Sequence, residues 1–168
     1  RYRYYLVEEK RPGQYIPIME DQRGTYIMNS KDLCLLEHLP ELLNLPIAAL
    51  KIEGRMKSVH YVATVTKVYR QAIDAYYDNP TQFCVQKEWL EELAKASNRS
   101  FTTGFFLGKP GPDAHVYEGE LYERQYEFIG VVQRYDAEKQ LLWVEQRNNF
   151  QVGDKLEILQ PQGEDDEL

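Results

Sequence analysis

The chain has 168 residues, 43% of them hydrophobic, which is enough to form a core and excludes global disorder. Its net charge is −7, and residues 84–168 carry 17 acidic against 9 basic side chains, which argues against a broad basic surface for nucleic acid there. No apolar run approaches the roughly 20 residues that span a bilayer, and two cysteines are too few for a disulfide framework. We therefore expect a cytoplasmic protein with no membrane partner.

Residues 1–83 alternate predicted strands and helices. Strand-like runs cover residues 2–9, 15–19 and 24–30, separated by the turn signals RPG and EDQRG. A helix is predicted over residues 31–39, with Asp32 in its first turn and Cys34 inside it. Pro40 either interrupts this helix or begins a second short one. A strand over residues 47–53 and a long helix after Ser58 complete an order typical of a parallel α/β arrangement.

The second half has a different pattern. Residues 87–97, KEWLEELAKAS, form a predicted amphipathic helix, and the Gly/Pro-rich stretch TTGFFLGKPGP follows. From about Tyr126 polar and apolar residues alternate with a period of two, which predicts an antiparallel β unit of three or more strands. We therefore divide the chain into residues 1–83, a linking helix and loop over 84–118, and a small β module with an acidic tail over 119–168.

Residues 50–58, LKIEGRMKS, form the strongest candidate site. On the predicted strand Lys51 and Glu53 share one face at the carboxyl end, where α/β folds build active sites. The amino end of the next helix adds donors that suit a phosphate or carboxylate. We assign Lys51, Glu53 and Arg55 to catalysis, and binding of an anion or of RNA to Lys57, Ser58 and His60. The alternative is an exposed strand whose charges are merely solvated.

Familiar catalytic motifs do not occur in the sequence. There is no GxSxG, no HExxH, no P-loop and no Cys/His spacing typical of a metal site. Judged from the residues alone, Cys34 is typical of a small core residue. Composition and spacing therefore leave the reaction open.

Three segments resemble peptidase family U32, the collagenase-like proteins: NSKDLC at 29–34, LKIEGRMKS at 50–58 and YVATVTKVYRQAID at 61–74. The start RYYLVEEKRPG, the stretch TTGFFLGKPGP and the strand EFIGVV are similar too, so the resemblance covers nearly the whole chain. It implies an α/β fold followed by an all-β one: the last strand and helix units of a (β/α) barrel, then a small antiparallel β-barrel module. We therefore expect the C-terminal portion of a longer protein, in keeping with a sequence that begins with Arg1 and not with Met.

The resemblance also implies a function. Several bacterial members hydroxylate the wobble uridine of transfer RNA with prephenate and hold an iron–sulfur cluster on four cysteines. Cys34 matches one ligand position; the other three ligands are absent from this chain, so the fragment is expected to hold no cluster and to be inactive. Transfer RNA, prephenate and a paralogous subunit are the implied partners. The family name implies instead a peptidase, and a non-catalytic RNA-binding module is a third possibility.

Overall fold

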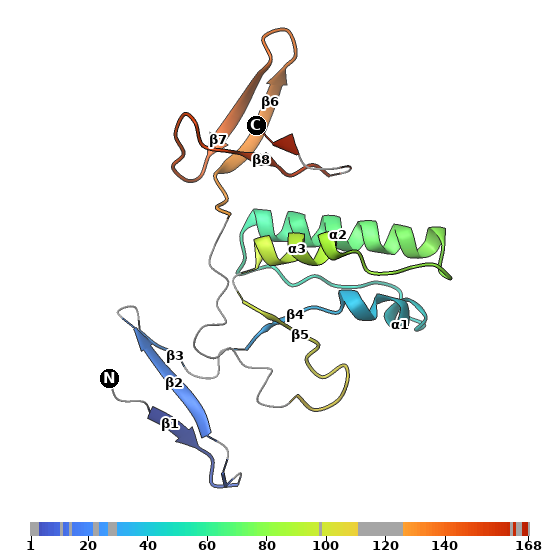
Figure 1. Cartoon of the computed structure of the whole chain (residues 1–168), viewed down its shortest axis with the longest axis vertical. Coiled ribbons are helices and arrows are strands. Elements are labelled where there is room, and N and C mark those ends of the chain that lie inside the picture. The colour runs from blue at the N-terminus through green and yellow to red at the C-terminus, as the bar shows by residue number, and fades with distance from the viewer. Residues whose placement is uncertain are drawn as a thin grey trace.

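A computed structural model describes residues 4–10, 12–13, 15–21, 24–26, 30–97, 99–110, 126–161, 163 and 166–167. Figure 1 shows an N-terminal sheet, a central layer of helices with the short pair β4–β5, and a C-terminal β hairpin. The fold is mixed α/β with small sheets. The described residues form no closed barrel, so the barrel part of the predicted fold class is not confirmed.

The N-terminal sheet is an antiparallel meander. Strands β1 (Tyr4–Val7), β2 (Tyr15–Asp21) and β3 (Gly24–Tyr26) pair in sequence order, with Tyr4 opposite Ile18 and Met19 opposite Tyr26. The first two predicted strands are confirmed, and residues 27–29 of the third lie outside the described residues. The predicted turns agree with this pairing, because connections as short as these join antiparallel neighbours.

The predicted helix over residues 31–39 is wrong at its start. Asp32–Leu33 form strand β4, parallel to β5 (Phe101–Thr102). The Asp32 N–H donates to Ser100 O at 2.9 Å and the Cys34 N–H to Thr102 O at 3.0 Å. These hydrogen bonds to a distant segment engage backbone N–H groups that a local helix would otherwise use for its own hydrogen bonds. Helical structure begins only with the 3-10 turn η1 (Leu36–His38) and helix α1 (Leu39–Leu43), whose first turn tolerates Pro40.

Two longer helices pack side by side in the central layer (Figure 1): α2 (Val59–Asp78) and α3 (Lys87–Ala96). Ser58 caps α2 as predicted, because its Oγ accepts the Tyr61 N–H at 3.1 Å. Between α1 and α2, residues 47–53 form no strand, so that prediction is wrong. A strand needs a hydrogen-bonded neighbour, and the described residues place none beside this segment.

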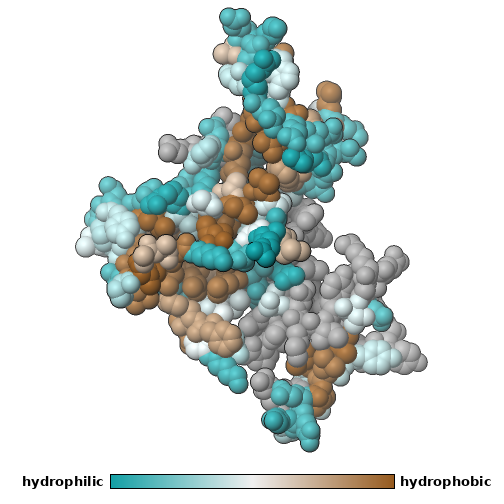
Figure 2. Space-filling view, turned by 180° about the vertical axis from the view of Figure 1, so that it is seen from behind, coloured by the Kyte–Doolittle hydropathy of each residue, from teal (hydrophilic) through white to brown (hydrophobic). Residues whose placement is uncertain are grey.

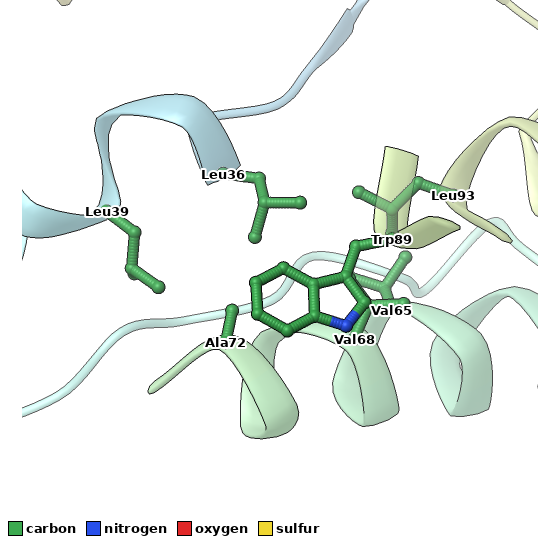
Figure 3. Packing of buried hydrophobic residues seen from close by; sticks show 7 residues of the cluster. All are labelled: Leu36, Leu39, Val65, Val68, Ala72, Trp89 and Leu93. Atoms are coloured by element: carbon green, nitrogen blue, oxygen red, sulfur yellow. The ribbon is translucent and has the colours of Figure 1, made fainter. Parts of the chain in front are cut away.

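The hydrophobic core lies where η1, α1, α2 and α3 meet. Figure 3 shows side chains from these elements turned toward the Trp89 indole. Leu36 and Leu39 are fully buried and Trp89 is 7% exposed. The core is completed by Val65, Val68, Ala72 and Leu93.

The C-terminal part is antiparallel, as predicted. Strands β6 (Gly130–Asp136) and β7 (Leu141–Gln146) form a hairpin, and β8 (Glu157–Ile158) pairs with β9 (Asp166–Glu167) in a separate sheet. Among the described residues, Lys95 Nζ ties this part to the helices: it lies 3.0 Å from Glu157 Oε1 and 4.8 Å from the centre of the Tyr126 ring. The His60 ring also stacks on Phe128, with centroids 6.1 Å apart.

Apolar surface remains exposed on the molecule. Figure 2 shows hydrophobic residues across the middle of the face that Figure 1 hides, with hydrophilic residues over the far end of the hairpin. Tyr4, Tyr15 and Phe105 are among the exposed large hydrophobic residues, at 62%, 66% and 78% of their surface. Among the helices that the structure describes, none combines the length and apolar character needed to cross a bilayer.

Candidate functional site

The segment LKIEGRMKS forms a loop instead of the end of a strand. Lys51 Nζ and Glu53 Oε2 lie 3.5 Å apart, with 85% and 71% of their side chains exposed. Glu53 Oε1 also accepts the Arg55 N–H at 3.2 Å, and the Lys57 N–H donates to Gly54 O at 2.9 Å, which closes a turn. The prediction that Lys51 and Glu53 share one face of a strand is therefore wrong, because without a strand the alternation of faces does not apply.

Lys57 differs from the other charges of this segment, because it points inward. Its Nζ lies 2.7 Å from Asp32 Oδ2, and the two side chains are only 27% and 12% exposed. Ser97, which is 4% exposed and follows α3, donates its Oγ–H to the same carboxylate oxygen at 2.9 Å. An ion pair in this setting is screened little by water, so it holds the start of α2 on β4 more firmly than a surface pair could.

Two tyrosines of α2 extend this polar cluster. Lys57 Nζ lies 4.8 Å from the centre of the Tyr61 ring. Tyr69 Oη accepts the Leu35 N–H at 3.0 Å and lies 3.8 Å from Cys34 Sγ. We call this group the β4–α2 cluster; its members are Asp32, Cys34, Lys57, Tyr61, Tyr69 and Ser97.

The phenols of the β4–α2 cluster are held in their neutral form. Burial raises the pKa of Tyr61 above its ordinary value, and the charges of Asp32 and Cys34 raise it further. Burial also raises the pKa of Tyr69, with the neighbouring Cys34 adding to the effect. At neutral pH the cluster therefore offers phenolic O–H groups beside a compensated ion pair.

The other residues of the predicted site, Arg55, Ser58 and His60, lie at the amino end of α2, each in a different environment. Arg55 is exposed, and no carboxylate of the described residues forms an ion pair with its side chain. The Ser58 hydroxyl is used as the helix cap. His60 is half-buried and stacks on Phe128, so its ring lies against the segment that leads into β6. An anion that binds here would meet Arg55 and the free N–H groups of the first turn of α2.

An iron–sulfur cluster does not fit this chain by itself. Such clusters are held by four cysteine thiolates or by cysteines with histidines. The sequence has two cysteines, of which Cys34 is half-buried and Cys84 exposed. Within the described residues no three His, Cys, Asp or Glu side chains are grouped so that they could hold a metal.

Sequence reasoning missed much of the β4–α2 cluster. Asp32 was assigned to a helix turn, and Ser97 received no role. Nothing in the sequence indicates that Lys57 reaches Asp32, because 25 residues separate them. A buried serine directly after α3 carries no recognisable pattern either.

The chain belongs to peptidase family U32. The family model "Peptidase family U32" matches residues 1–115, and "Peptidase family U32 C-terminal domain" matches residues 124–168. The predicted family is therefore confirmed.

Curated relatives carry two kinds of name. tRNA hydroxylation protein P1 of Bacillus subtilis is 44% identical over 147 residues, which cover 88% of this chain and 35% of that protein. tRNA hydroxylation protein P of Escherichia coli is 39% identical over 163 residues, covering 95% of this chain and 35% of that protein. A protein of Porphyromonas gingivalis named Collagenase is 32% identical over 161 residues, covering 95% of this chain and 38% of that protein. This chain thus spans much less than two thirds of these relatives, and no solved structure matches it.

Proposed function

We propose that this chain is the C-terminal portion of a cytoplasmic protein that hydroxylates the wobble uridine of transfer RNA, with prephenate as co-substrate. The observation that carries the proposal is the 44% identity to tRNA hydroxylation protein P1, which extends over 88% of the chain. Transfer RNA is the substrate class that the names of these relatives state. Prephenate and a paralogous subunit are further parts of the proposal.

In the whole protein, this chain would supply the last units of a (β/α) barrel and a small β-barrel module. The pair β4–β5 supports this, because it is parallel and the connection between its strands contains α2 and α3. The exposed apolar residues of β1 and β2 also support it, since they offer surface that a larger protein can cover (Figure 2).

The amino end of α2 is the proposed anion site. Its free N–H groups and the Arg55 guanidinium suit the carboxylates of prephenate or a phosphate of the RNA. Lys57 is held by Asp32 and so contributes less to binding than to the position of the turn. Lys51 and Glu53 lie exposed beside Arg55 and are the proposed catalytic rim.

Cys34 is the proposed contribution of this chain to an iron–sulfur cluster in the whole protein. It directly follows β4, the end of a parallel strand at which such folds place functional side chains. The remaining thiolates have to come from outside this chain. Arg55 and the first turn of α2 could bind an anion whether or not the iron–sulfur cluster is present.

The experiment is complementation of a strain that lacks the full-length gene. Mass spectrometry of its transfer RNA should show the wobble nucleoside lighter by one oxygen, and the wild-type gene should restore it. The variants Arg55→Ala and Lys51→Ala should restore hydroxylation poorly. Arg70→Ala is the matched control, because Arg70 lies on the exposed surface of α2 and pairs with Asp74. If the wobble uridine of the deletion strain is still hydroxylated, the proposed function is refuted. If both variants restore hydroxylation fully, the proposed site is refuted.

A peptidase is the second candidate, favoured by the relative named Collagenase. The described residues speak against it: the buried hydroxyl of Ser97 donates to Asp32, and the sulfur of Cys34 neighbours Tyr69, so neither has a histidine base beside it. Cleavage of gelatin by the full-length protein, abolished by one point substitution, would establish this alternative. RNA binding by the full-length protein without either activity would indicate the non-catalytic module.

A further inference from the structure

The hairpin β6–β7 sorts its side chains onto two faces. Val132 lies opposite Val144, and an irregularity at Gln133 shifts the register so that Arg134 lies opposite Trp143. Successive residues of a strand point to opposite sides, so Trp143 lies on the face away from Val144. We call this the Trp143 face; by the same register it carries Val131, Gln133, Arg134, Asp136, Leu141, Trp143 and Glu145.

The centre of the Trp143 face is a stacked pair. The guanidinium carbon of Arg134 lies 3.9 Å from the centre of the Trp143 ring, and 40% of Trp143 is exposed. Within the described part of the chain, no carboxylate pairs with Arg134. A planar cation laid on an indole presents a second flat surface to solvent, and nucleic acid bases stack on both kinds of surface.

The carboxylates nearest this pair are already engaged. Glu145 accepts a hydrogen bond from Gln133 Nε2 at 2.8 Å and pairs with Arg147 Nη2 at 2.6 Å. Asp136 Oδ1 accepts the backbone N–H groups of Glu138 and Lys139, at 3.1 Å each, in the hairpin turn. The Arg147 cation offsets the charge of Glu145 and reduces its repulsion of a phosphate, whereas Asp136 keeps its negative charge.

We infer that the Trp143 face binds an unpaired base of RNA, which stacks on the Arg134–Trp143 pair. Residues 84–168 carry 17 acidic against 9 basic side chains, so attraction to phosphates cannot supply most of the binding energy, and stacking has to. Loops and ends of RNA offer such bases, whereas a duplex keeps them stacked on each other. The inference rests on the proposed function, because transfer RNA is the substrate class proposed above, and it names the surface that receives a base.

Tryptophan fluorescence gives a direct test of this site. The chain has two tryptophans, and Trp89 lies in the core at 7% exposure, so quenching by added RNA reports on Trp143. The probes are oligouridine, unmodified transfer RNA and a blunt RNA duplex, added to the whole chain. Oligouridine and transfer RNA should quench the emission and the duplex should not. Affinity should fall only slightly with salt, as expected for one or two phosphate contacts.

Variants of the pair sharpen the test. Trp143→Leu should weaken binding of oligouridine by at least about fivefold, as for loss of one stacked base. Trp143→Phe keeps an aromatic face and should bind within about threefold of the wild type, which separates stacking from misfolding. Arg134→Gln should weaken binding by about threefold. Tyr135→Leu is the matched control: it lies on the opposite face, is 58% exposed and should bind like the wild type. These affinities are read by fluorescence anisotropy of labelled RNA.

Two results would overturn the inference. One is equal affinity of the wild type, Trp143→Leu and Arg134→Gln for RNA. The other is that neither oligouridine nor transfer RNA binds, which would indicate that the face binds a protein instead. The complementation experiment separates this from the proposed function. If RNA stacks on Trp143 but the deletion strain keeps its hydroxylated wobble uridine, only the proposed function is refuted. Full restoration of hydroxylation together with unaltered RNA binding by Trp143→Leu refutes only the surface.

Discussion

Lys57 and Asp32 lie 25 residues apart in the chain, yet 2.7 Å separates Nζ from Oδ2. Ser97, 65 residues beyond Asp32, donates to the same oxygen. One carboxylate thus joins β4, the turn before α2 and the end of α3. Because all three groups are mostly shielded from water, the contact fixes how the first turn of α2, with Arg55 before it, is presented.

Removal of the shared acceptor should destabilise the fold. We expect Asp32→Ala to lower the free energy of unfolding by about 2 kcal/mol, because Lys57 loses its ion-pair partner in a mostly buried place. Ser97 loses one acceptor but keeps Arg99 O, 2.9 Å from its Oγ. Lys57 keeps some access to water, which limits the loss. Urea denaturation measures it. The exposed pair gives the control: Glu53→Ala should cost less than about 0.5 kcal/mol. Equal costs for both variants would show that the buried pair is not special.

The hydrophobic core should be sensitive to truncation of its side chains. Leu36 is fully buried among α2 and α3 side chains, so we expect Leu36→Ala to cost about 2–5 kcal/mol through lost burial and a cavity. Leu33, three residues earlier, is 63% exposed, and Leu33→Ala should cost less than about 1 kcal/mol. Thermal unfolding followed by circular dichroism compares the two. Similar melting temperatures would contradict the packing described here.

The cap of α2 should contribute measurably. In Ser58→Ala the Tyr61 N–H loses its acceptor, and we expect a loss of about 1 kcal/mol in the free energy of unfolding. Ser58→Asp retains an acceptor and places a negative charge at the helix amino end, so it should preserve stability. Chemical denaturation of the two variants decides. An Ala variant as stable as the wild type would show that water replaces the cap at no cost.

Tyr61 should make stability depend on alkaline pH. Burial raises its pKa in the folded protein, above the ordinary value of about 10 in the unfolded chain. The unfolded state therefore loses its proton first, so stability from this group is present below about pH 10 and is lost as pH rises through the folded-state pKa. We expect the free energy of unfolding to fall less steeply in Tyr61→Phe than in the wild type above about pH 10. Superimposable pH profiles would contradict this.

Gly130 should be intolerant of a side chain. A Cβ at this position would lie 2.5 Å from the carbonyl oxygen of Glu145 and 2.7 Å from Val144 Cγ1. Because the first contact is with the backbone of β7, relief requires the hairpin to shift, and we expect Gly130→Ala to cost about 1–3 kcal/mol. Hydrogen exchange of β6 and β7 amides measures the opening of the hairpin. Undiminished protection in the variant would count against the close approach.

Features that depend on neighbouring residues could be predicted from the amino-acid sequence. The Ser58 cap needs only the three residues that follow it, and the inward side of α3 follows from the spacing of Trp89 and Leu93. The turns between β1, β2 and β3 and the alternation in β6 and β7 are likewise local. The motif LKIEGRMKS was sufficient for the family, which the family models confirm.

Contacts between segments that are distant in the chain could not be predicted in this way and became visible in the folded protein. Asp32 lies in a strand because Ser100 and Thr102 offer hydrogen bonds there. Residues 47–53 form no strand, since no strand of the described residues pairs with them. Lys57 turns inward because the mostly buried carboxylate of Asp32 lies within its reach. Lys51 and Arg55 stay exposed, and within the described residues neither pairs with a buried carboxylate. Local propensity amounts to a fraction of a kcal/mol per residue, so hydrogen bonds and burial gained across the fold outweigh it.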